Sequence, residues 1–312
     1  MMKLLSTAAV GLALAATAQA NSIDRAGSLL VFPYFSNTSG STTFLTVTNS
    51  NADAAGTIDV EFVYINGDDC LEFNRTRRLT PNDTITVSTN LDNPNDRRGY
   101  VYAFAKSTTT GAAVSFNFLE GNSIVVNFAE ALSTNIAPVV YAAVPAQGAN
   151  TDVDGDGNRD MNGAEYVSSA NEIHIPRFVA SSDSSLIVLG LTGAQFRTVI
   201  SFLAYNDNEE AFSGQFTVDC WDIKRLQNIS GVFTDGFLES TNHNVGETGI
   251  SQLETGWIRL VGQTAFSTAA QRSNPAFIAV SIDLAFYSSL PYGAGTNNNG
   301  DLLVLGPFAD NN

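Results

Sequence analysis

Apolar and polar residues alternate along much of this chain, and elsewhere apolar residues form short runs that end at Gly, Asn, Asp or Pro. Alternation with a period of two places successive side chains on opposite faces of a strand. Residues 58–64 show this pattern, with Ile58, Val60, Phe62 and Tyr64 on one face and Asp59, Glu61 and Val63 on the other. We expect the first face to lie in a core and the second to face water.

The same pattern recurs along the chain and predicts an all-β fold. Further strands are expected at residues 44–49, 99–104, 113–118, 186–189, 198–203 and 279–284. The many Thr, Val, Phe and Tyr residues favour strands over helices. Beyond the first 20 residues, the sequence contains no long amphipathic helical pattern.

Similar segments occur in the same order in the two halves of the chain. The pairs are FPYF and IPRF, TIDVEFVYING and RTVISFLAYND, RRLTPNDT and KRLQNIS, GYV and GWI, and AAVSFNF and AVSIDLAF. This order predicts an internal duplication, in which each half is an antiparallel immunoglobulin-like β-sandwich of about seven strands. We therefore expect tandem domains at residues 21–148 and 172–312, joined by a connector at 149–171. A single large sandwich or barrel is the alternative.

The N-terminus is typical of a secretory signal peptide over residues 1–20. Lys3 precedes an apolar stretch at residues 4–16, and Ala18-Gln19-Ala20 provides a small-residue cleavage site. The apolar stretch is too short to span a bilayer, and no later segment has the roughly 20 apolar residues that spanning requires. We expect a secreted protein, periplasmic or extracellular, with no membrane insertion. The short, Ala-rich signal favours a bacterial source.

Composition agrees with an exported globular protein. The 312 residues are 44% hydrophobic and 15% charged, with a net charge of −16. A chain of this length can bury a large core and form two domains of roughly 100–200 residues each. Its acidity argues against binding nucleic acid, because phosphates require a basic face. It argues equally against electrostatic binding to anionic lipid.

The predicted connector contains TDVDGDGNRDMNGAE, residues 151–165, which is the most acidic stretch of the chain. Clustered carboxylates repel one another unless water screens them or a cation binds them. Asp152, Asp154 and Asp156 occupy positions one, three and five of a calcium loop, Gly157 the turn at six, the Asn158 carbonyl position seven, and Asp160 position nine. These residues resemble the loops of the dockerin, thrombospondin type-3 and EF-hand-like group.

The resemblance covers roughly a dozen residues and departs from the pattern at position twelve. That position normally carries a bidentate acid and is Gly163 here, although Asn162 and Glu165 are close in sequence. We therefore expect Ca2+ to be held by the ligand set Asp152, Asp154, Asp156, Asn158, Asp160 and Glu165. Affinity in the ~10⁻⁴–10⁻³ M range of extracellular modules is expected. A solvated acidic linker, or a site for magnesium or another ion, are the alternatives.

Cys70 and Cys220 form an even pair, and an oxidising compartment permits a disulfide between them. If both cysteines occupy similar places in duplicated halves, however, they can bond only where the halves meet at those places. The sequence therefore favours two separate buried thiols, with a disulfide between the halves as the alternative.

Residues for catalysis are few, and we predict a protein that is not an enzyme. His174 and His243 have no recognisable nucleophile beside them, and neither a G-x-S-x-G elbow nor zinc-ligand spacing occurs. The carboxylate pairs at residues 68–69 and 209–210 could in principle serve glycoside hydrolysis. Both pairs lie in sequence typical of turns, where charge keeps hairpins soluble.

Two further groups of side chains are candidates for binding. Five arginines lie close together in sequence, namely Arg75, Arg77, Arg78, Arg97 and Arg98. Their guanidinium groups can bind carboxylates of a partner, or more simply acids of the same chain. Four aromatic residues, Tyr34, Tyr100, Trp221 and Trp257, could stack on sugar rings, although packing in a core or sheet is the commoner role.

GSLLVFPYF, FLTVTNSN, CLEFNRTRRLTPNDT and DVDGDGNRDMNG together resemble a group of exported bacterial proteins that has no established activity. The resemblance covers most of the mature chain and implies no substrate. Our hypothesis is a secreted, non-enzymatic surface, matrix or adhesion protein whose connector is rigidified by calcium. Its expected partners are other surface proteins, further copies of itself or extracellular glycans. A carbohydrate-binding module and a polysaccharide-active enzyme are the alternatives.

Overall fold

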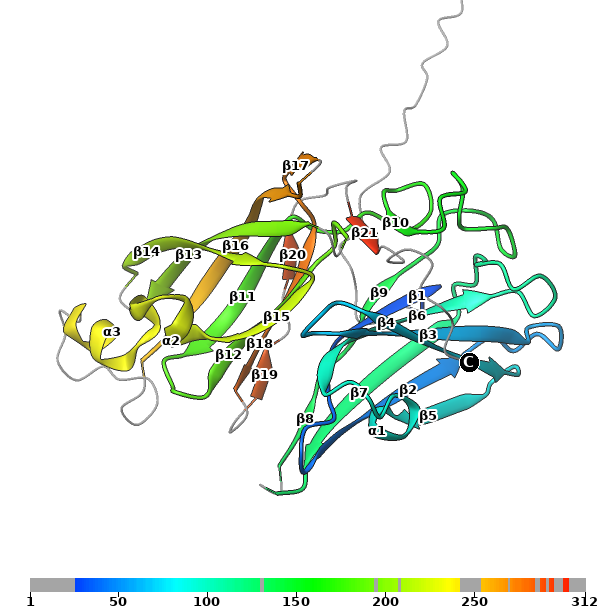
Figure 1. The fold of residues 1–312 in the computed structure, drawn as a ribbon, viewed down its shortest axis with the longest axis horizontal. Helices are drawn as coiled ribbons and strands as arrows, with labels where there is room; N and C mark the ends of the chain where they lie inside the picture. The colour runs from blue at the N-terminus through cyan, green and yellow to red at the C-terminus, as the bar shows by residue number, and fades with distance from the viewer. Residues whose placement is uncertain are drawn as a thin grey trace, which may run out of the picture.

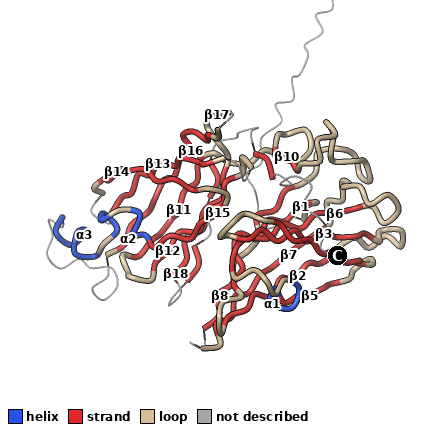
Figure 2. Tube along the Cα trace, viewed as in Figure 1, coloured by secondary structure: helices blue, strands red, loops and turns tan. Residues whose placement is uncertain are grey.

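The computed structural model describes residues 26–129, 132–193, 196–206, 209–241, 254–268, 270–283, 287–289, 292–294 and 300–302. Antiparallel strands make up most of this part of the chain (Figure 1). Figure 2 shows how few segments are helical, namely α1 (Thr89–Asp92), α2 (Leu226–Ile229), η1 (Gly231–Phe233) and α3 (Asp235–Thr241). The predicted all-β class is confirmed, and the predicted signal peptide at residues 1–20 lies outside the described residues.

The first set of strands forms two sheets. Its strands are β1 (Leu29–Ser36), β2 (Ser41–Asn49), β3 (Ile58–Asn66), β4 (Glu72–Leu79), β5 (Thr84–Ser88), β6 (Arg98–Lys106), β7 (Leu119–Asn127), β8 (Leu132–Asn135) and β9 (Val139–Tyr141). One sheet, here called the first inner sheet, has the order β4-β3-β6-β1-β9. The other, the first outer sheet, has the order β5-β2-β7-β8.

The second set also forms two sheets. Its strands are β11 (Glu172–Val179), β12 (Ser184–Gly190), β13 (Arg197–Asn206), β14 (Ala211–Val218), β15 (Trp221–Arg225), β16 (Thr255–Phe266), β17 (Gln271–Ser273), β18 (Phe277–Asp283), β19 (Tyr287–Ser289) and β20 (Tyr292–Ala294). The second outer sheet has the order β14-β13-β16-β11-β20, with β17 on β16. The second inner sheet has the order β15-β12-β18-β19.

The strand order of the two sets is the same, which supports the predicted duplication. Strands β11 to β16 correspond to β1 to β6, and β18 to β20 correspond to β7 to β9. With these correspondences, the first inner sheet has the same strand order as the second outer sheet, and the first outer sheet the same order as the second inner sheet. The pairs FPYF with IPRF, TIDVEFVYING with RTVISFLAYND, and GYV with GWI therefore lie on equivalent strands.

A local irregularity is also repeated in the two sets. The register of β1 against β6 shifts between Phe32 and Phe35, and that of β11 against β16 shifts between Ile175 and Phe178. Each shift ends opposite a glycine, Gly99 in β6 and Gly256 in β16. A Cβ atom would lie 1.9 Å from a backbone oxygen at Gly99 and 2.0 Å from one at Gly256, so the chain passes too close for any side chain.

Two of the sequence pairings were wrong. RRLTPNDT begins at the end of β4, whereas KRLQNIS begins in β15, the counterpart of β5. AAVSFNF precedes β7, whereas AVSIDLAF begins within β18, the counterpart of β7. Short apolar or basic segments resemble one another by chance, so similarity alone did not identify the equivalent strands.

The two inner sheets pack face to face and bury a hydrophobic cluster, here called the shared core. In Figure 1 the first set lies at the right, in blue to green, and the second set at the left, in green to red. The shared core includes Leu29, Val31, Val63, Ile65, Tyr100, Tyr102 and Phe104 of the first inner sheet and Ile187, Leu189, Trp221, Ile278, Val280 and Ile282 of the second. Separate cores lie between the inner and outer sheet of each set. Each inner sheet is therefore buried on both faces.

The prediction that one face of residues 58–64 meets water was wrong. Val63 is in the shared core, with 2% of its surface exposed. Glu61 is also buried, where it accepts a hydrogen bond from the Thr76 hydroxyl and pairs with Lys106 at 3.1 Å. Glu61 is thus satisfied inside the protein, whereas Asp59 is partly exposed and pairs with Arg78.

Trp221 joins the two inner sheets directly. Its indole nitrogen donates a hydrogen bond to the Pro33 carbonyl oxygen at 2.9 Å, and its ring stacks on Tyr34 with centroids 6.1 Å apart. A side chain at Gly67 would collide with the indole ring, at 2.4 Å. Tyr100 is also buried in the shared core. Three of the four aromatic residues considered for sugar stacking therefore hold the halves together instead.

Cys70 and Cys220 form a disulfide between the two sets, with Cα atoms 6.2 Å apart, so the expectation of two separate thiols was wrong. Cys70 follows β3, whereas Cys220 follows β14, so the two positions are not equivalent in the duplicated topology. The packing of the inner sheets brings these different turns within the distance that a disulfide requires.

Replacing both cysteines with serine should lower the free energy of unfolding by about 2–4 kcal/mol, because the cross-link restricts the unfolded chain. The shared core should still hold the inner sheets together in this variant. Urea denaturation measures the effect, with reductant added to the unaltered protein as the control that should reproduce it. Equal stability of the two proteins under oxidising conditions would contradict this role of the disulfide.

Candidate metal centre

The acidic loop belongs to the connector between β9 and β11, and its flanks are fixed to the first set. Thr151 donates a backbone hydrogen bond to Ala113 at 3.1 Å, and Val144 donates one to Glu165 at 2.8 Å. The loop leads into β10 (Arg159–Met161), which pairs with β21 (Gly300–Leu302). Met161 and Tyr166 are part of the shared core, so the loop is attached where the two sets meet.

Glycines at two loop positions adopt backbone conformations that other residues avoid. Gly155 has φ 78° and Gly157 has φ 85°, both in the left-handed region. The turn expected at position six of the loop is therefore present at Gly157. It allows the short segment from Asp152 to Asn158 to fold back on itself.

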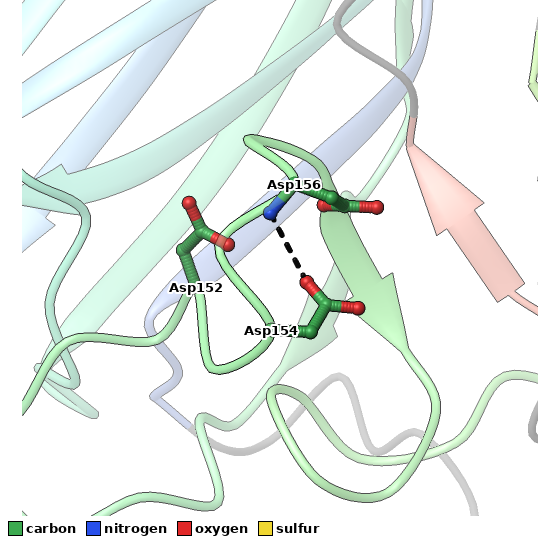
Figure 3. Close-up of side chains that lie close together, drawn as sticks. All are labelled: Asp152, Asp154 and Asp156. Carbon is green, nitrogen blue, oxygen red and sulfur yellow. Dashed lines mark hydrogen bonds between the residues drawn. The ribbon is translucent and has the colours of Figure 1, made fainter.

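Three carboxylates meet at the tip of the loop. One oxygen from each of Asp152, Asp154 and Asp156 lies within 4.8 Å of the others, and Figure 3 shows how the three side chains lie around the turn. Asp152 Oδ1 accepts from the Gly155 N–H at 2.9 Å, and Asp154 Oδ1 accepts from the Asp156 N–H at 3.2 Å. The loop backbone thus holds the carboxylates together on a partly exposed surface.

The spacing of these three carboxylates would allow them to hold one metal ion. Calcium binds oxygen at about 2.3–2.6 Å, so two ligands on opposite sides of one ion are roughly 4.6–5.2 Å apart. Oxygens within 4.8 Å of one another can therefore surround a single ion after small adjustments. Three carboxylates would supply hard oxygen ligands, which calcium prefers to nitrogen or sulfur.

The other predicted ligands lie beside this group rather than in it. The Asn158 N–H and side-chain amide both donate to Asp156, at 2.8 Å and 2.7 Å, and the Asn158 carbonyl accepts from the Arg159 guanidinium. Asp160 Oδ2 accepts from the Asn162 side chain at 3.2 Å. Asn158 and Asp160 are thus adjacent to the three aspartates, and each would need to rearrange to bind the same ion.

Glu165 interacts with the backbone on both sides of the acidic loop. Its side chain is buried, with 1% of the residue exposed, and it accepts backbone hydrogen bonds from Val153 at 2.5 Å and from Asp160 at 3.1 Å. Burial raises the pKa of the Glu165 carboxyl, while these two N–H groups act in the opposite direction. The Glu165 carboxylate therefore links Val153, near the start of the acidic loop, to Asp160 in β10 through these two hydrogen bonds.

Arg159 is a further residue of this site that the sequence did not single out. It is buried, with 8% exposed, and its guanidinium lies over the Phe104 ring, 4.6 Å from the centroid. It places one positive charge between the acidic loop and the shared core. The alternation of Arg159, Asp160 and Met161 in a short strand was the available signal, since it puts Arg159 and Met161 on the same face.

Three of the five arginines pair with acids of the same chain, in line with the simpler of the two interpretations. Arg77 pairs with Asp92 at 2.5 Å, Arg78 with Asp59 at 2.8 Å, and Arg98 with Asp68 at 3.1 Å. The Arg75 side chain donates to the Asp92 carbonyl oxygen at 3.3 Å and lies over the Phe73 ring.

The residues considered for catalysis are dispersed. His174 lies on β11, where it contacts Glu172 at 2.8 Å and the Trp257 ring, and His243 is outside the described residues. The carboxylate pair at 68–69 lies between β3 and β4, and the pair at 209–210 lies between β13 and β14. Both pairs are therefore in the connections where the sequence placed them.

Comparison with known proteins identifies no family model that matches the chain and no curated protein that is similar to it. In the described part of the chain, none of the helices has the length and apolar character needed to cross a membrane.

Replacing Glu165 with glutamine should loosen the acidic loop. The amide offers one oxygen in place of two, so one backbone N–H of Val153 or Asp160 loses its acceptor, at a cost of about 1–3 kcal/mol. Hydrogen exchange at these two amides should then become faster. Glu120→Gln, a change at an exposed position of β7, is the matched control. Unchanged exchange in Glu165→Gln would show that the carboxylate does not brace the loop.

Proposed function

We propose that this protein is an exported, non-enzymatic structural or adhesion protein whose connector binds calcium. The observation that carries the proposal is the group of three carboxylates, Asp152, Asp154 and Asp156, within 4.8 Å of one another. Three negative charges this close are unfavourable without a counter-charge, and a divalent ion would remove the repulsion. Asn158, Asp160 and Glu165 are the further proposed ligands, and each would have to move toward the three aspartates to reach the same ion.

The proposed domains are immunoglobulin-like sandwiches over residues 21–148 and 172–312, with the connector at 149–171. Each has an inner and an outer sheet over its own core, which supports this division. Because the shared core and the disulfide already join the inner sheets, calcium would mainly order the connector loop that packs against them.

An extracellular or periplasmic location is proposed with this role. The disulfide between Cys70 and Cys220 is compatible with an oxidising compartment, and the predicted signal peptide would direct export. Binding of a structural ion stabilises the conformation that presents its ligands. At the millimolar calcium levels found outside cells, a site of ~10⁻⁴–10⁻³ M affinity would be substantially occupied.

Calcium should raise the midpoint of thermal unfolding relative to chelator. For dissociation constants of ~10⁻⁴–10⁻³ M, about 10 mM calcium adds roughly 1.4–2.7 kcal/mol to the folded state. The double variant Asp154→Asn/Asp156→Asn should lose this increase. Asp53→Asn, an exposed aspartate that caps another turn, should keep it. Differential scanning calorimetry with calcium or with chelator makes the comparison.

Isothermal titration of calcium should give a binding heat with the unaltered protein and with Asp53→Asn, and none with the double variant. Identical midpoints in calcium and chelator, together with no binding heat, would remove the metal from the account. An equal response to magnesium would show that the loop binds divalent ions without preference for calcium.

A further inference from the structure

The second outer sheet has one face on its own core, and no element of the described residues covers its other face. On β13, Ser201, Leu203 and Tyr205 alternate with buried residues and lie on the open face. On β14 the exposed positions include Ser213 and Gln215. A groove of about 570 Å³ runs over this face, across β14, β13 and β16.

The strand register places the groove residues in rows across the sheet. Leu203 pairs with Ser213 on one side and with Arg259 on the other. Ser201 pairs with Gln215 and with Val261 in the next row. Each row therefore combines an apolar side chain with side chains that form hydrogen bonds. Leu203 and Val261 provide the apolar part, in adjacent rows.

The charges in and beside the groove are matched. Arg259 donates two hydrogen bonds to Glu172, from Nε at 2.8 Å and from Nη2 at 2.7 Å. The Arg259 guanidinium holds the pKa of Glu172 at about 2, so both groups stay ionised and paired near neutral pH. In a chain of net charge −16, this face is thus locally neutral. It favours neither an anionic nor a cationic ligand.

The remaining polar groups are hydroxyls and amides. Gln263 is exposed and donates to the Ser201 hydroxyl at 2.8 Å, which orients both side chains. Ser213 and Gln215 are exposed on the opposite side of the groove. These groups can donate and accept hydrogen bonds without a charge. They match a ligand that carries many neutral hydroxyl groups.

An aromatic row borders the groove. Tyr205 stacks on Trp257 with ring centroids 4.4 Å apart, and His174 approaches Trp257 at 5.9 Å. Tyr205 lies two residues beyond Leu203, and Trp257 lies two residues before Arg259, so the row adjoins the groove on the same face. The Trp257 ring lies between the rings of Tyr205 and His174, so these side chains present mainly their ring edges to the groove. The apolar floor of the groove is formed by Leu203 and Val261.

Because the groove lies on the face of a sheet and not at its edge, it suits a sugar chain better than a peptide strand. The backbone groups of β13 are engaged in ladders with β14 and β16, so the face offers side-chain groups rather than free backbone groups. A peptide that adds a strand needs such backbone groups, which are found at sheet edges. A sugar chain needs neutral hydrogen-bonding groups for its hydroxyls and apolar surface for its C–H faces.

We propose that this groove on the second outer sheet binds a neutral polysaccharide chain. The groove contains no residue of the connector, so this proposal is separate from calcium binding. It identifies neutral polysaccharides as the class of partner for an adhesive role. Because the groove is open at the surface, the ligand is an extended chain rather than an enclosed small molecule.

Affinity electrophoresis of the full chain through gels that contain dextran, galactomannan, xylan or mixed-linkage β-glucan tests the proposal. At least one of these neutral polymers should retard the protein. Ser213→Trp, which fills the groove, should weaken this binding about tenfold or more. Thr217→Trp is the control, because Thr217 is exposed on the same strand and face but does not line the groove, and it should bind within about twofold of the unaltered protein.

Gln215→Ala with Gln263→Ala is a second test that adds no bulk, and circular dichroism checks the folding of every variant. This pair of changes should also weaken binding, and retardation should persist in chelator, which separates the groove from the calcium site. No retardation by any neutral polymer, retardation by anionic alginate alone, or undiminished binding by both groove variants would overturn the proposal. So would a dimer in sedimentation velocity that Ser213→Trp dissociates, because a second copy would then occupy the groove.

Discussion

The packing of the two inner sheets against each other is the constraint on which the rest of this structure depends. A sheet that is buried on both faces cannot use the ordinary alternation of apolar and polar residues. β12 accordingly has every residue buried, and β1 and β6 are buried almost throughout. Trp221 and the disulfide add a hydrogen bond and a covalent link across the same junction. The two sets of strands are therefore joined by a buried core and a disulfide in addition to the connector.

This arrangement determines where other molecules can bind. Within the described residues the inner sheets are covered, so partners and ions would bind elsewhere, for example on the second outer sheet or at the connector loop. The loop rests on Met161 and Tyr166, which are part of the shared core, and Glu165 and Arg159 support it from beneath. An ion at the three aspartates would thus stabilise a loop whose base is already fixed. The groove on the second outer sheet lies away from this junction, and its proposed role does not require the ion.

The sequence predicted most of the strands and the acidic loop well, because both depend on local patterns. The strand expected at residues 113–118 was wrong, since this segment forms only isolated bridges before β7. Alternation identified the segments around Phe62 and Phe202, and the spacing of the aspartates brought three of them together at a turn made by Gly157. The shared core was not predicted, because burial of a second face depends on a distant sheet. For the same reason Val63 was expected in water, and Cys70 and Cys220 were expected apart. The role of Glu165 depends on two backbone N–H groups that spacing alone does not place.

The central claim is that the inner sheets unfold together because they share one core. It is tested most directly by calorimetry under reducing conditions, where the disulfide no longer links the two sets. Two-state unfolding requires the calorimetric enthalpy to equal the van't Hoff enthalpy and requires different probes to agree. We predict a single transition in calorimetry, far-ultraviolet circular dichroism and the fluorescence of Trp221 and Trp257. Two separated transitions, one for each set of strands, would contradict the account.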